Sequence, residues 1–237
     1  MENRGVLYLI PTSIGETSLK DVLLDRDILI VESLNYFIVE TPKIARAHLK
    51  GLNVVLQDLD MRVLNRHTRR KDIPFLLEPL IEGSNVGLMS DAGTPAIADP
   101  GSIVVRECHR LGIKVVPLIG PSSIILALMA SGLNGQSFTF NGYLPRDSES
   151  RQRRIRELES ISMKTGTSQV FMETPYRNKL LLKDIIQVCQ KNTDLSIAVN
   201  VSGKDEYIKT MRIEEWRHKK SVNIINIPTI FILQGRK

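Results

Sequence analysis

The fold of this chain is decided by residues 86–118, which read VGLMSDAGTPAIADPGSIVVRECHRLGIKVVPL. Two short apolar segments, residues 86–89 and 114–118, are typical of buried strands. Residues 101–111 between them have helical periodicity and end at Gly112, where a left-handed C-cap favours glycine. Two strands joined by a helix form a crossover unit, so this stretch predicts a parallel sheet.

The rest of the first half repeats this alternation of strands and helices. Residues 5–10 and 28–31 are predicted as strands, and residues 18–25, 35–50 and 73–82 as helices. After a predicted helix at 121–131, the pattern contains more strands and fewer crossovers, with extended segments near 137–143, 169–172, 195–201, 207–213 and 229–233. We therefore expect an α/β fold of two α/β domains: residues 1–119 with a mostly parallel sheet, and residues 120–237 with a mixed sheet.

Composition and charge exclude several classes of protein. Of the 237 residues, 42% are hydrophobic and 24% charged, which is typical of globular chains. The longest uncharged stretch, residues 115–145, is broken by prolines and glycines, so we expect no membrane span. The net charge is +6, and residues 121–237 carry 18 Lys/Arg against 11 Asp/Glu. This excess favours a polyanionic partner, although a basic cytosolic protein without one is an equal alternative.

Three loops follow predicted strands, at the sheet edge where ligands of open α/β sheets bind. They begin at Pro11, at Ser90 and at Gly120, and none is a dinucleotide or nucleoside-triphosphate fingerprint. In the loop 90–101, Asp91 or Asp99 is a candidate to balance a cationic ligand or to bind a ribose hydroxyl, while the alternative for Asp99 is a helix cap. The other two loops, taken alone, are equally explained as a turn and a capped helix start.

Two basic clusters are candidates for RNA binding, because arginines neutralise phosphates without reading sequence. An exposed helix face that binds nothing is the alternative for each cluster. The candidate residues are Arg62, Arg66, Arg69, Arg70 and Lys71 in the first cluster and Arg146, Arg151, Arg153 and Arg154 in the second. The four histidines lack ligand spacing and the two cysteines lie far apart, so we expect no metal.

Four motifs in order make the chain resemble the tetrapyrrole methylase superfamily, and within it the enzymes that methylate ribose 2′-oxygens of small-subunit ribosomal RNA. The motifs are residues 90–101 (SDAGTPAIADPG), 117–133 (PLIGPSSIILALMASGL), 140–146 (FNGYLPR) and 171–177 (FMETPYR). The resemblance implies S-adenosylmethionine bound in a cleft between two α/β domains, usually within a homodimer. The two cysteines, Cys108 and Cys189, fit a reduced cytosol, so we expect a cytoplasmic enzyme. The residues that the resemblance places at the cofactor are Pro11, Asp91, Thr94, Ile97, Ser122, Ser123, Met172, Asn200, Val201, Pro228 and Thr229.

Two segments depart from the pattern of these RNA methyltransferases. A Glu-Asp-Thr-Arg segment usually follows the second strand, where this chain reads Glu32-Ser33-Leu34-Asn35. An Arg-Glu-x-Thr-Lys segment usually lies in the second domain, where only Lys204 of residues 200–204 matches. The catalytic residue is unknown; Lys204 is a candidate for electrostatic support and Glu173 for a base or a positioning group.

Three functions remain open at this point. The first is ribose 2′-O-methylation of small-subunit ribosomal RNA, and the second is methylation of a tetrapyrrole or another small molecule. The third is a non-catalytic RNA-binding factor on a methyltransferase scaffold. The basic clusters favour RNA, whereas the altered segments keep the second function possible.

Overall fold

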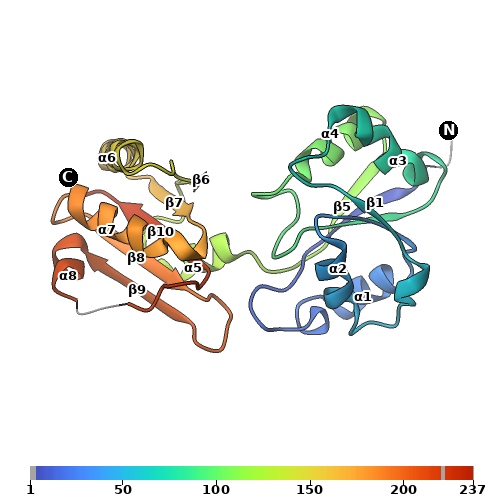
Figure 1. Ribbon diagram of the computed structural model, residues 1–237, viewed down its shortest axis with the longest axis horizontal. Helices are drawn as coiled ribbons and strands as arrows, with labels where there is room; N and C mark the ends of the chain where they lie inside the picture. Colours follow the sequence, from blue (N-terminus) through green and yellow to red (C-terminus); the bar gives the residue numbers. More distant parts are fainter. Residues whose placement is uncertain (1–3, 220–221, 237) are drawn as a thin grey trace. The chain divides into compact units, whose positions relative to one another are not determined.

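The computed structural model describes residues 4–219 and 222–236. The chain forms two compact units, Met1–Ser122 and Ser123–Lys237 (Figure 1). Each unit contains one five-stranded sheet with helices packed on it.

The first unit is built on an all-parallel sheet with the strand order β3-β2-β4-β1-β5. Its strands are β1 (Val6–Ile10), β2 (Tyr36–Val39), β3 (Asp60–Val63), β4 (Val86–Met89) and β5 (Lys114–Pro117). Its helices are α1 (Asp25–Glu32), α2 (Pro42–Leu49), α3 (Ile73–Ile81) and α4 (Ser102–Arg110), with 3-10 turns at Leu19–Asp21, Leu56–Asp58 and Arg70–Asp72. Residues 86–118 therefore form the predicted crossover unit, with β1 inserted between its two strands.

Helices cover both faces of this sheet, as expected for a parallel sheet. The helices α3 and α4 pack on one face through Leu77 and Val104, whereas α1 and α2 pack on the other through Val31 and Leu49 (Figure 1). Alternate residues of each strand supply the two cores, because successive side chains of a strand point to opposite faces. In β2, for example, Ile38 enters the first core and Phe37 the second.

The helix predicted at residues 18–25 is only a 3-10 turn at Leu19–Asp21, strand β3 was not predicted, and two further predicted elements of this unit are wrong. Residues 28–31 lie in α1 rather than in a strand, and residues 35–50 contain β2 before α2 begins. The run at 28–31 is too short for periodicity to separate a buried strand from a buried helical turn. In the second case Pro42 starts the helix at a position that proline favours, so the β-branched and aromatic residues before it are free to form a strand.

The second unit is built on a mixed sheet with the order β6-β7-β10-β8-β9. Its strands are β6 (Phe138–Tyr143), β7 (Ser168–Met172), β8 (Asp194–Val199), β9 (Tyr207–Arg212) and β10 (Thr229–Gln234). Only β6 and β7 pair in parallel; β10 is antiparallel to β7 and β8, and β9 is antiparallel to β8. The predicted mixed sheet is confirmed.

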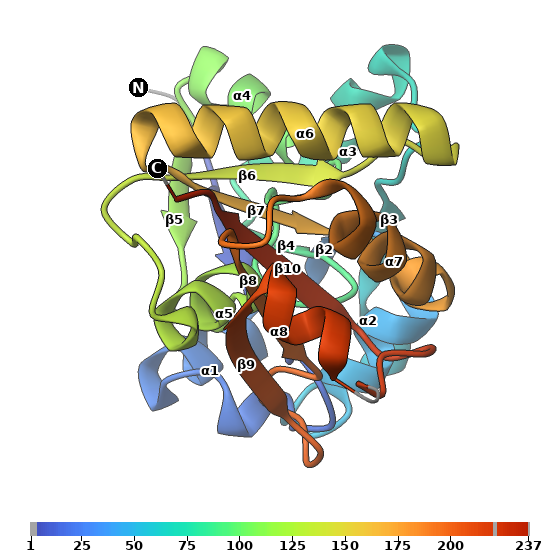
Figure 2. The same cartoon turned by 90° about the vertical axis from the view of Figure 1, so that its left-hand side faces the viewer.

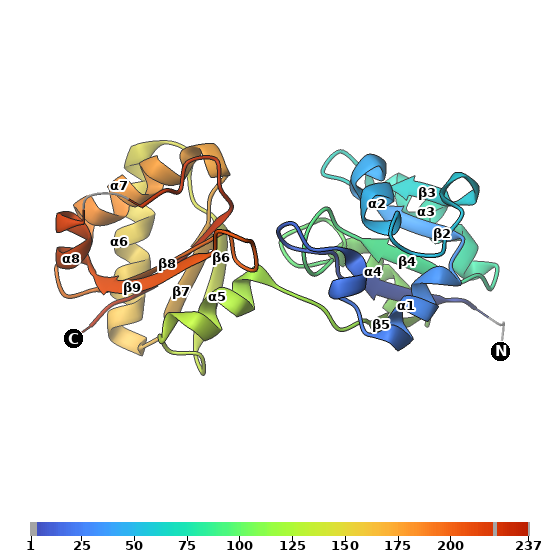
Figure 3. The same cartoon turned by 90° about the horizontal axis from the view of Figure 1, so that it is seen from below.

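Helices pack on both faces of the second sheet. They are α5 (Ser123–Ser131), α6 (Ser148–Thr165), α7 (Asn178–Val188) and α8 (Ile213–His218), with a 3-10 turn at Pro175–Arg177. The core between the sheet and α6, α7 and α8 contains Phe171, Phe231 and Trp216 (Figure 2). Helix α5 lies on the opposite face, against β8, β9 and β10 (Figure 3).

The described residues contain neither a helix that could span a membrane nor a cluster of side chains that could bind a metal ion. No helix in these ranges combines the length and the hydropathy that crossing a membrane requires. Within residues 4–219 and 222–236, no three His, Cys, Asp or Glu side chains are grouped as a metal site would need.

Candidate functional site

Four loops of the first unit meet at the carboxyl edge of its sheet. Because all five strands are parallel, the segments that follow β1, β2, β4 and β5 leave the sheet at this one edge. The segments after β1, β4 and β5 contain the predicted cofactor residues Pro11, Asp91, Thr94, Ile97 and Ser122. The topology therefore brings together residues that lie up to about 110 positions apart in the sequence.

These loops are bound to each other by short contacts. The backbone N–H of Thr12 donates to the carbonyl of Gly93 at 2.8 Å, and the Thr94 hydroxyl donates to the carbonyl of Pro121 at 3.3 Å. A Cβ built on Gly120 would overlap the ring of Pro11, so glycine is required for the close approach of the first and last loops. Pro11, Thr94 and Ser122 thus belong to one interlocked group of loops.

The long loop 90–101 is shaped by its own carboxylate. Asp99 Oδ1 accepts hydrogen bonds from the N–H of Ala96 at 2.9 Å and of Gly101 at 2.8 Å. Ala96 and Ala98 have positive φ angles of 66° and 64°, an uncommon conformation for alanine that these bonds help to hold. Ile97 lies between them with 54% of its surface exposed, which leaves it free to contact a ligand.

The segment after β2 adds an acidic residue that the sequence analysis missed. Burial, followed by the negative charges of Asp91 and Asp99, raises the pKa of Glu40 above its usual value. The next residue, Thr41, donates through its hydroxyl to Asp91 Oδ2 at 2.8 Å, and His48 Nε2 lies 3.0 Å from the Asp91 carbonyl oxygen. Reading residues 35–50 as one helix concealed this segment, although Pro42 marks where the helix starts.

The position of β2 also changes which residues of this chain correspond to the Glu-Asp-Thr-Arg segment of the RNA methyltransferases that it resembles. The second strand ends at Val39, so the segment that follows it is Glu40-Thr41-Pro42-Lys43 and not Glu32-Ser33-Leu34-Asn35. Residues 32–35 instead join α1 to β2. An acid and a threonine are therefore present after the second strand, and this departure is smaller than the sequence analysis concluded.

The electrostatics of this edge fit a cationic cofactor. Glu40, Asp91 and Asp99 are close enough for the charges of the two aspartates to raise the pKa of Glu40. Burial also raises the pKa of Asp99. A positively charged group near these carboxylates would favour their ionised forms. S-adenosylmethionine carries a sulfonium and an ammonium group, so the residues of this edge suit it.

In the second unit, strand order brings the remaining predicted cofactor residues together. β10 lies between β7 and β8 and is antiparallel to both, so it begins where they end. Thr229 pairs with Val199 and Ile230 pairs with Met172, while the N–H of Asn200 donates to the carbonyl of Pro228 at 2.9 Å. Met172, Asn200, Val201, Pro228 and Thr229 therefore share one edge. Ser123 is the first residue of α5.

The two candidate catalytic residues have different surroundings. Glu173 is 4% exposed, and its Oε1 accepts from the N–H of Thr174 at 2.7 Å and from Arg177 Nη2 at 2.5 Å. Its Oε2 is buried and has no hydrogen-bond partner among the described residues. This arrangement fixes the turn after β7 and suits a positioning group better than a base. Lys204 is exposed in the turn that joins β8 to β9.

The first basic cluster is mostly exposed. Arg66, Arg69, Arg70 and Lys71 lie on the surface between β3 and α3. Arg62 differs, because its side chain is only 11% exposed and is bound to Asp60 and to Glu78, each at 3.1 Å. Its guanidinium also stacks on the ring of Phe75, 4.2 Å from the centroid. Arg62 therefore serves the internal structure of this unit.

The second cluster, at the start of α6 and just before it, also contains both exposed and buried arginines. Arg146 and Arg153 are exposed, and Arg154 is partly exposed with an ion pair to Glu157 at 3.1 Å. Arg151, by contrast, is 4% exposed and forms an ion pair with Asp184 at 2.5 Å. A guanidinium held inside the protein cannot neutralise an external phosphate, so we correct the sequence-based assignment of Arg151 to RNA binding.

Comparisons with known proteins identify what the chain resembles. The chain is 33% identical over 238 residues to the Escherichia coli O157:H7 protein named Ribosomal RNA small subunit methyltransferase I, covering 99% of this chain and 79% of that protein. It is 32% identical over 244 residues to the protein of the same name from Buchnera aphidicola subsp. Schizaphis graminum (strain Sg), covering 96% and 79%.

Two solved structures have the same fold. The methyltransferase CobJ aligns with a TM-score of 0.63 at 14% identity, covering 98% of this chain and 94% of that chain. Uroporphyrin-III-C-methyltransferase from Thermus thermophilus aligns with a TM-score of 0.54 at 16% identity, covering 98% and 93%. The predicted arrangement of two α/β domains is confirmed by the two sheets and by these structures.

The family follows from the sequence itself. A profile of the tetrapyrrole (corrin/porphyrin) methylases matches residues 21–216, which is most of the chain. Together with relatives above 30% identity along nearly the whole length, this match confirms the predicted family, enzyme class and cofactor. The chain belongs to the tetrapyrrole methylase family and is an S-adenosylmethionine-dependent methyltransferase.

Proposed function

We propose that this enzyme methylates a ribose 2′-oxygen in the RNA of the small ribosomal subunit. The observation that carries the proposal is the match to relatives named Ribosomal RNA small subunit methyltransferase I over 96–99% of this chain. Exposed cations on both units support an RNA substrate, because phosphate contacts supply much of the affinity for RNA. The methyl acceptor and its position in the RNA are what the experiment must establish.

We propose that the cofactor-binding residues lie at the carboxyl edge of the first sheet and at the edge of the second sheet where β7 and β8 end and β10 begins. In the first unit, the residues are Pro11, Asp91, Thr94, Ile97 and Ser122, with Glu40 added for its charge. In the second unit, they are Ser123, Met172, Asn200, Val201, Pro228 and Thr229. When bound, S-adenosylmethionine supplies an electrophilic methyl group, so the protein's task is to align the acceptor oxygen at about 3–3.5 Å and to exclude water.

Few residues then have a direct chemical role. We assign Glu173 to positioning, because its carboxylate is bound by Arg177 and Thr174 and fixes the turn after Met172. Lys204 is exposed and cationic, which suits contact with a phosphate or with the negative charge left on the acceptor oxygen as its proton departs. No residue is assigned as general base.

The proposed RNA surface consists of the exposed cations of the two clusters. These are Arg66, Arg69, Arg70, Lys71, Arg146, Arg153 and Arg154. Arg62 is left out because its guanidinium is nearly buried against Phe75, and Arg151 because buried Asp184 already binds it. Arg156, which the sequence analysis did not select, is exposed beside Arg153 and joins the surface.

The test is methyl transfer from radiolabelled S-adenosylmethionine to small ribosomal subunits that lack the modification. We expect label in the RNA that survives alkaline hydrolysis and that nuclease digestion releases as a 2′-O-methylnucleoside. Thr94→Arg should abolish transfer by filling the cofactor edge, whereas Thr139→Arg, which introduces the same side chain at an exposed strand position, should not.

The other outcomes identify the alternatives. Cofactor binding without RNA labelling, combined with methylation of a tetrapyrrole, would replace the RNA substrate by a small molecule. RNA binding with no cofactor binding at millimolar concentration would indicate a non-catalytic factor. The cytoplasmic location and the homodimer stay predictions. Light scattering of the purified protein tests the homodimer, and fractionation of cells tests the location.

A further inference from the structure

The second unit contains a cavity of about 680 Å³ that the proposed cofactor residues do not line. Asp194 at the start of β8, Arg212 at the end of β9 and Gln234 at the end of β10 contribute to its wall. The proposed cofactor residues Asn200 and Thr229 lie at the other ends of β8 and β10. Thr229 and Gln234 are five residue steps apart along the strand, a distance of about 17 Å. The cavity is therefore a separate site of the same sheet.

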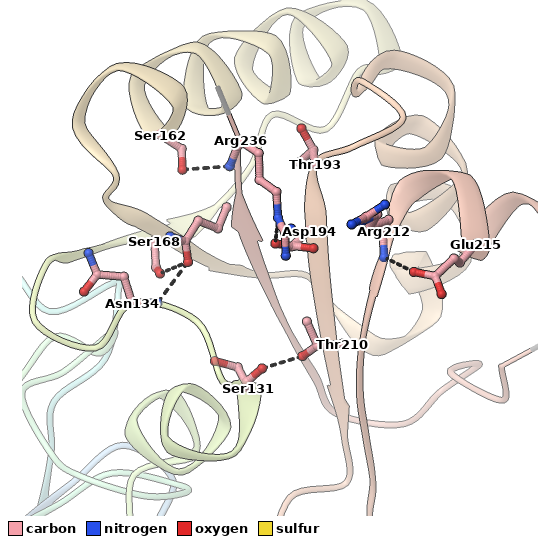
Figure 4. Close-up of polar contacts among 12 residues, drawn as sticks. Ser131, Asn134, Ser162, Ser168, Thr193, Asp194, Thr210, Arg212, Glu215 and Arg236 are labelled. Carbon is pink, nitrogen blue, oxygen red and sulfur yellow. Dashed lines mark hydrogen bonds and ion pairs between the residues drawn. The ribbon is translucent and has the colours of Figure 1, made fainter.

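Two arginines and a buried carboxylate form the polar part of this cavity. Asp194 pairs across the strands with Arg212 on one side and Gln234 on the other, and it is 7% exposed. Arg236 Nε donates to Asp194 Oδ2 at 2.5 Å. Figure 4 shows the guanidinium groups of Arg236 and Arg212 on either side of Asp194. The Asp194 charge is thus balanced by Arg236.

Arg212 is the cation that this arrangement leaves most free. Its side chain is 49% exposed, and it forms an ion pair at 3.5 Å with Glu214, which is 46% exposed. Water screens such a pair strongly, so a ligand anion can replace Glu214 at little cost. The ion pairs of the described residues do not include one between Glu215 and this guanidinium, and Glu215 Oε2 instead accepts from the Arg212 backbone N–H at 2.8 Å (Figure 4).

Hydrogen-bond acceptors and donors complete the wall. The Gln234 Oε1 already accepts from the N–H of Asn134 at 2.9 Å and from the Ser168 hydroxyl at 3.4 Å, so its amide nitrogen is the group that it can offer a ligand. Asp194 and Glu215 each have a second carboxylate oxygen that can accept a hydrogen bond. The cavity therefore offers cations and acceptors together rather than charge of one sign.

We propose that this cavity binds one nucleoside monophosphate unit. Guanidinium groups match the geometry of phosphate oxygens, which assigns the phosphate to Arg212 and Arg236. Carboxylates commonly accept hydrogen bonds from ribose hydroxyls, which assigns the sugar to Asp194 and Glu215. The volume lies within the usual range for small-ligand sites. The unit comes either from an RNA strand or from a free nucleotide, and the binding itself does not depend on the proposed methylation.

The experiment titrates the full chain with uridine 5′-monophosphate by calorimetry. Saturating S-adenosylhomocysteine is present throughout, so that the cofactor edge is blocked. We expect saturable binding, with uridine and inorganic phosphate each binding much more weakly than the monophosphate. Arg212→Gln should weaken binding about tenfold or more, because a charged hydrogen-bond partner of the phosphate is removed. Arg46→Gln, which removes an exposed arginine from α2, should leave binding unchanged.

The outcomes decide both the proposal and the source of the nucleotide. If Arg212→Gln also weakens RNA binding and uridine monophosphate competes with RNA, the bound nucleotide is part of the RNA strand. If only monophosphate binding is weakened, the ligand is a free nucleotide. No monophosphate binding at millimolar concentration, equal binding by Arg212→Gln, or binding of inorganic phosphate as tight as that of the nucleotide would each overturn the proposal. Loss of methyl transfer with monophosphate binding intact would count against the proposed function alone.

Discussion

The two units hold their proposed cofactor residues in different ways. In the first unit, parallel strands deliver several loops to one edge, and the loops are bound to one another through Thr12, Gly93, Thr94 and Pro121. In the second unit, the residues lie at the ends of three adjacent strands, where the antiparallel register of β10 fixes them. One edge depends on contacts between loops, and the other on strand pairing and on anchors such as Glu173.

This difference is accompanied by a difference in charge. The edge of the first unit gathers Glu40, Asp91 and Asp99, whereas the second unit carries the chain's excess of Lys and Arg. The acidic edge of the first unit favours a cationic cofactor, and the positive charge of the second unit adds to the exposed cations of the first cluster in favouring a polyanionic substrate. Each unit can therefore be disturbed separately, and one unit can serve as the control for the other.

The largest effect is expected in the second unit, at its buried ion pair. Arg151→Met leaves Asp184 buried without its cation, which should cost about 3–5 kcal/mol of unfolding free energy. Denaturant unfolding measured by Trp216 fluorescence reports on this unit, because Trp216 is in its core. Arg153→Met, two residues along the same helix, should change the unfolding free energy by less than about 0.5 kcal/mol. Equal losses in both variants would contradict the distinction between buried and exposed arginines.

The second largest effect is expected in the first unit, where Gly120 meets Pro11. Gly120→Val places side-chain atoms in the Pro11 ring, so the loops must separate at a cost of about 1–3 kcal/mol. Calorimetric titration should then show weaker S-adenosylmethionine binding even under conditions in which the variant is fully folded. Gly51→Val, at a position whose Cβ meets no atom within 4 Å, is the control. Unchanged cofactor affinity in Gly120→Val would show that the interlocked loops do not form the site.

The loops of the first unit and the ion pair of the second also show which features could be predicted from the sequence and which could not. Residues 86–118 carry enough local signal, in apolar runs and a glycine cap, to predict the crossover unit and the loop after β4. The partner of Arg151 could not be predicted, because Asp184 lies 33 residues away and only the packing of α6 on α7 brings the two together. Glu40 was missed because a short strand and a short helix were read as one longer helix.

An intermediate effect concerns the exposed cations of the first cluster. Replacing Arg69, Arg70 and Lys71 with Gln should weaken RNA binding and reduce the slope of log K against log salt by about 0.7 for each phosphate that is no longer neutralised. Filter binding at several salt concentrations measures this slope. Replacing Lys20, Arg46 and Lys50 with Gln removes the same charge from another surface of the unit and should leave the slope unchanged. If the slope falls equally in both triple variants, net charge rather than this cluster determines RNA binding.

The smallest effect is the pH dependence that Glu40 imposes on the first unit. Because its folded pKa is raised, ionised Glu40 disfavours folding, and this cost appears as the pH rises from the ordinary value of 4.5 through the raised pKa. Glu40→Gln should therefore stabilise the cofactor-free protein slightly at neutral pH and have no such effect below about pH 4.5. Thermal unfolding across this pH range measures the difference. Glu82→Gln, on an exposed residue after α3, is the matched control.

Cofactor binding should show the opposite preference at the same residue. A cation beside Glu40 favours its ionised form, so S-adenosylmethionine affinity should fall as the pH falls through the raised pKa of Glu40. Glu40→Gln should weaken binding at neutral pH by about tenfold or less, and it should flatten the pH profile, because the uncharged amide cannot attract the cation. If Glu40→Gln makes the protein more stable but binds S-adenosylmethionine more weakly, the three carboxylates destabilise the cofactor-free protein and strengthen cofactor binding. If Glu40→Gln binds as tightly as the unaltered protein at every pH, the acidic edge does not contact the cofactor.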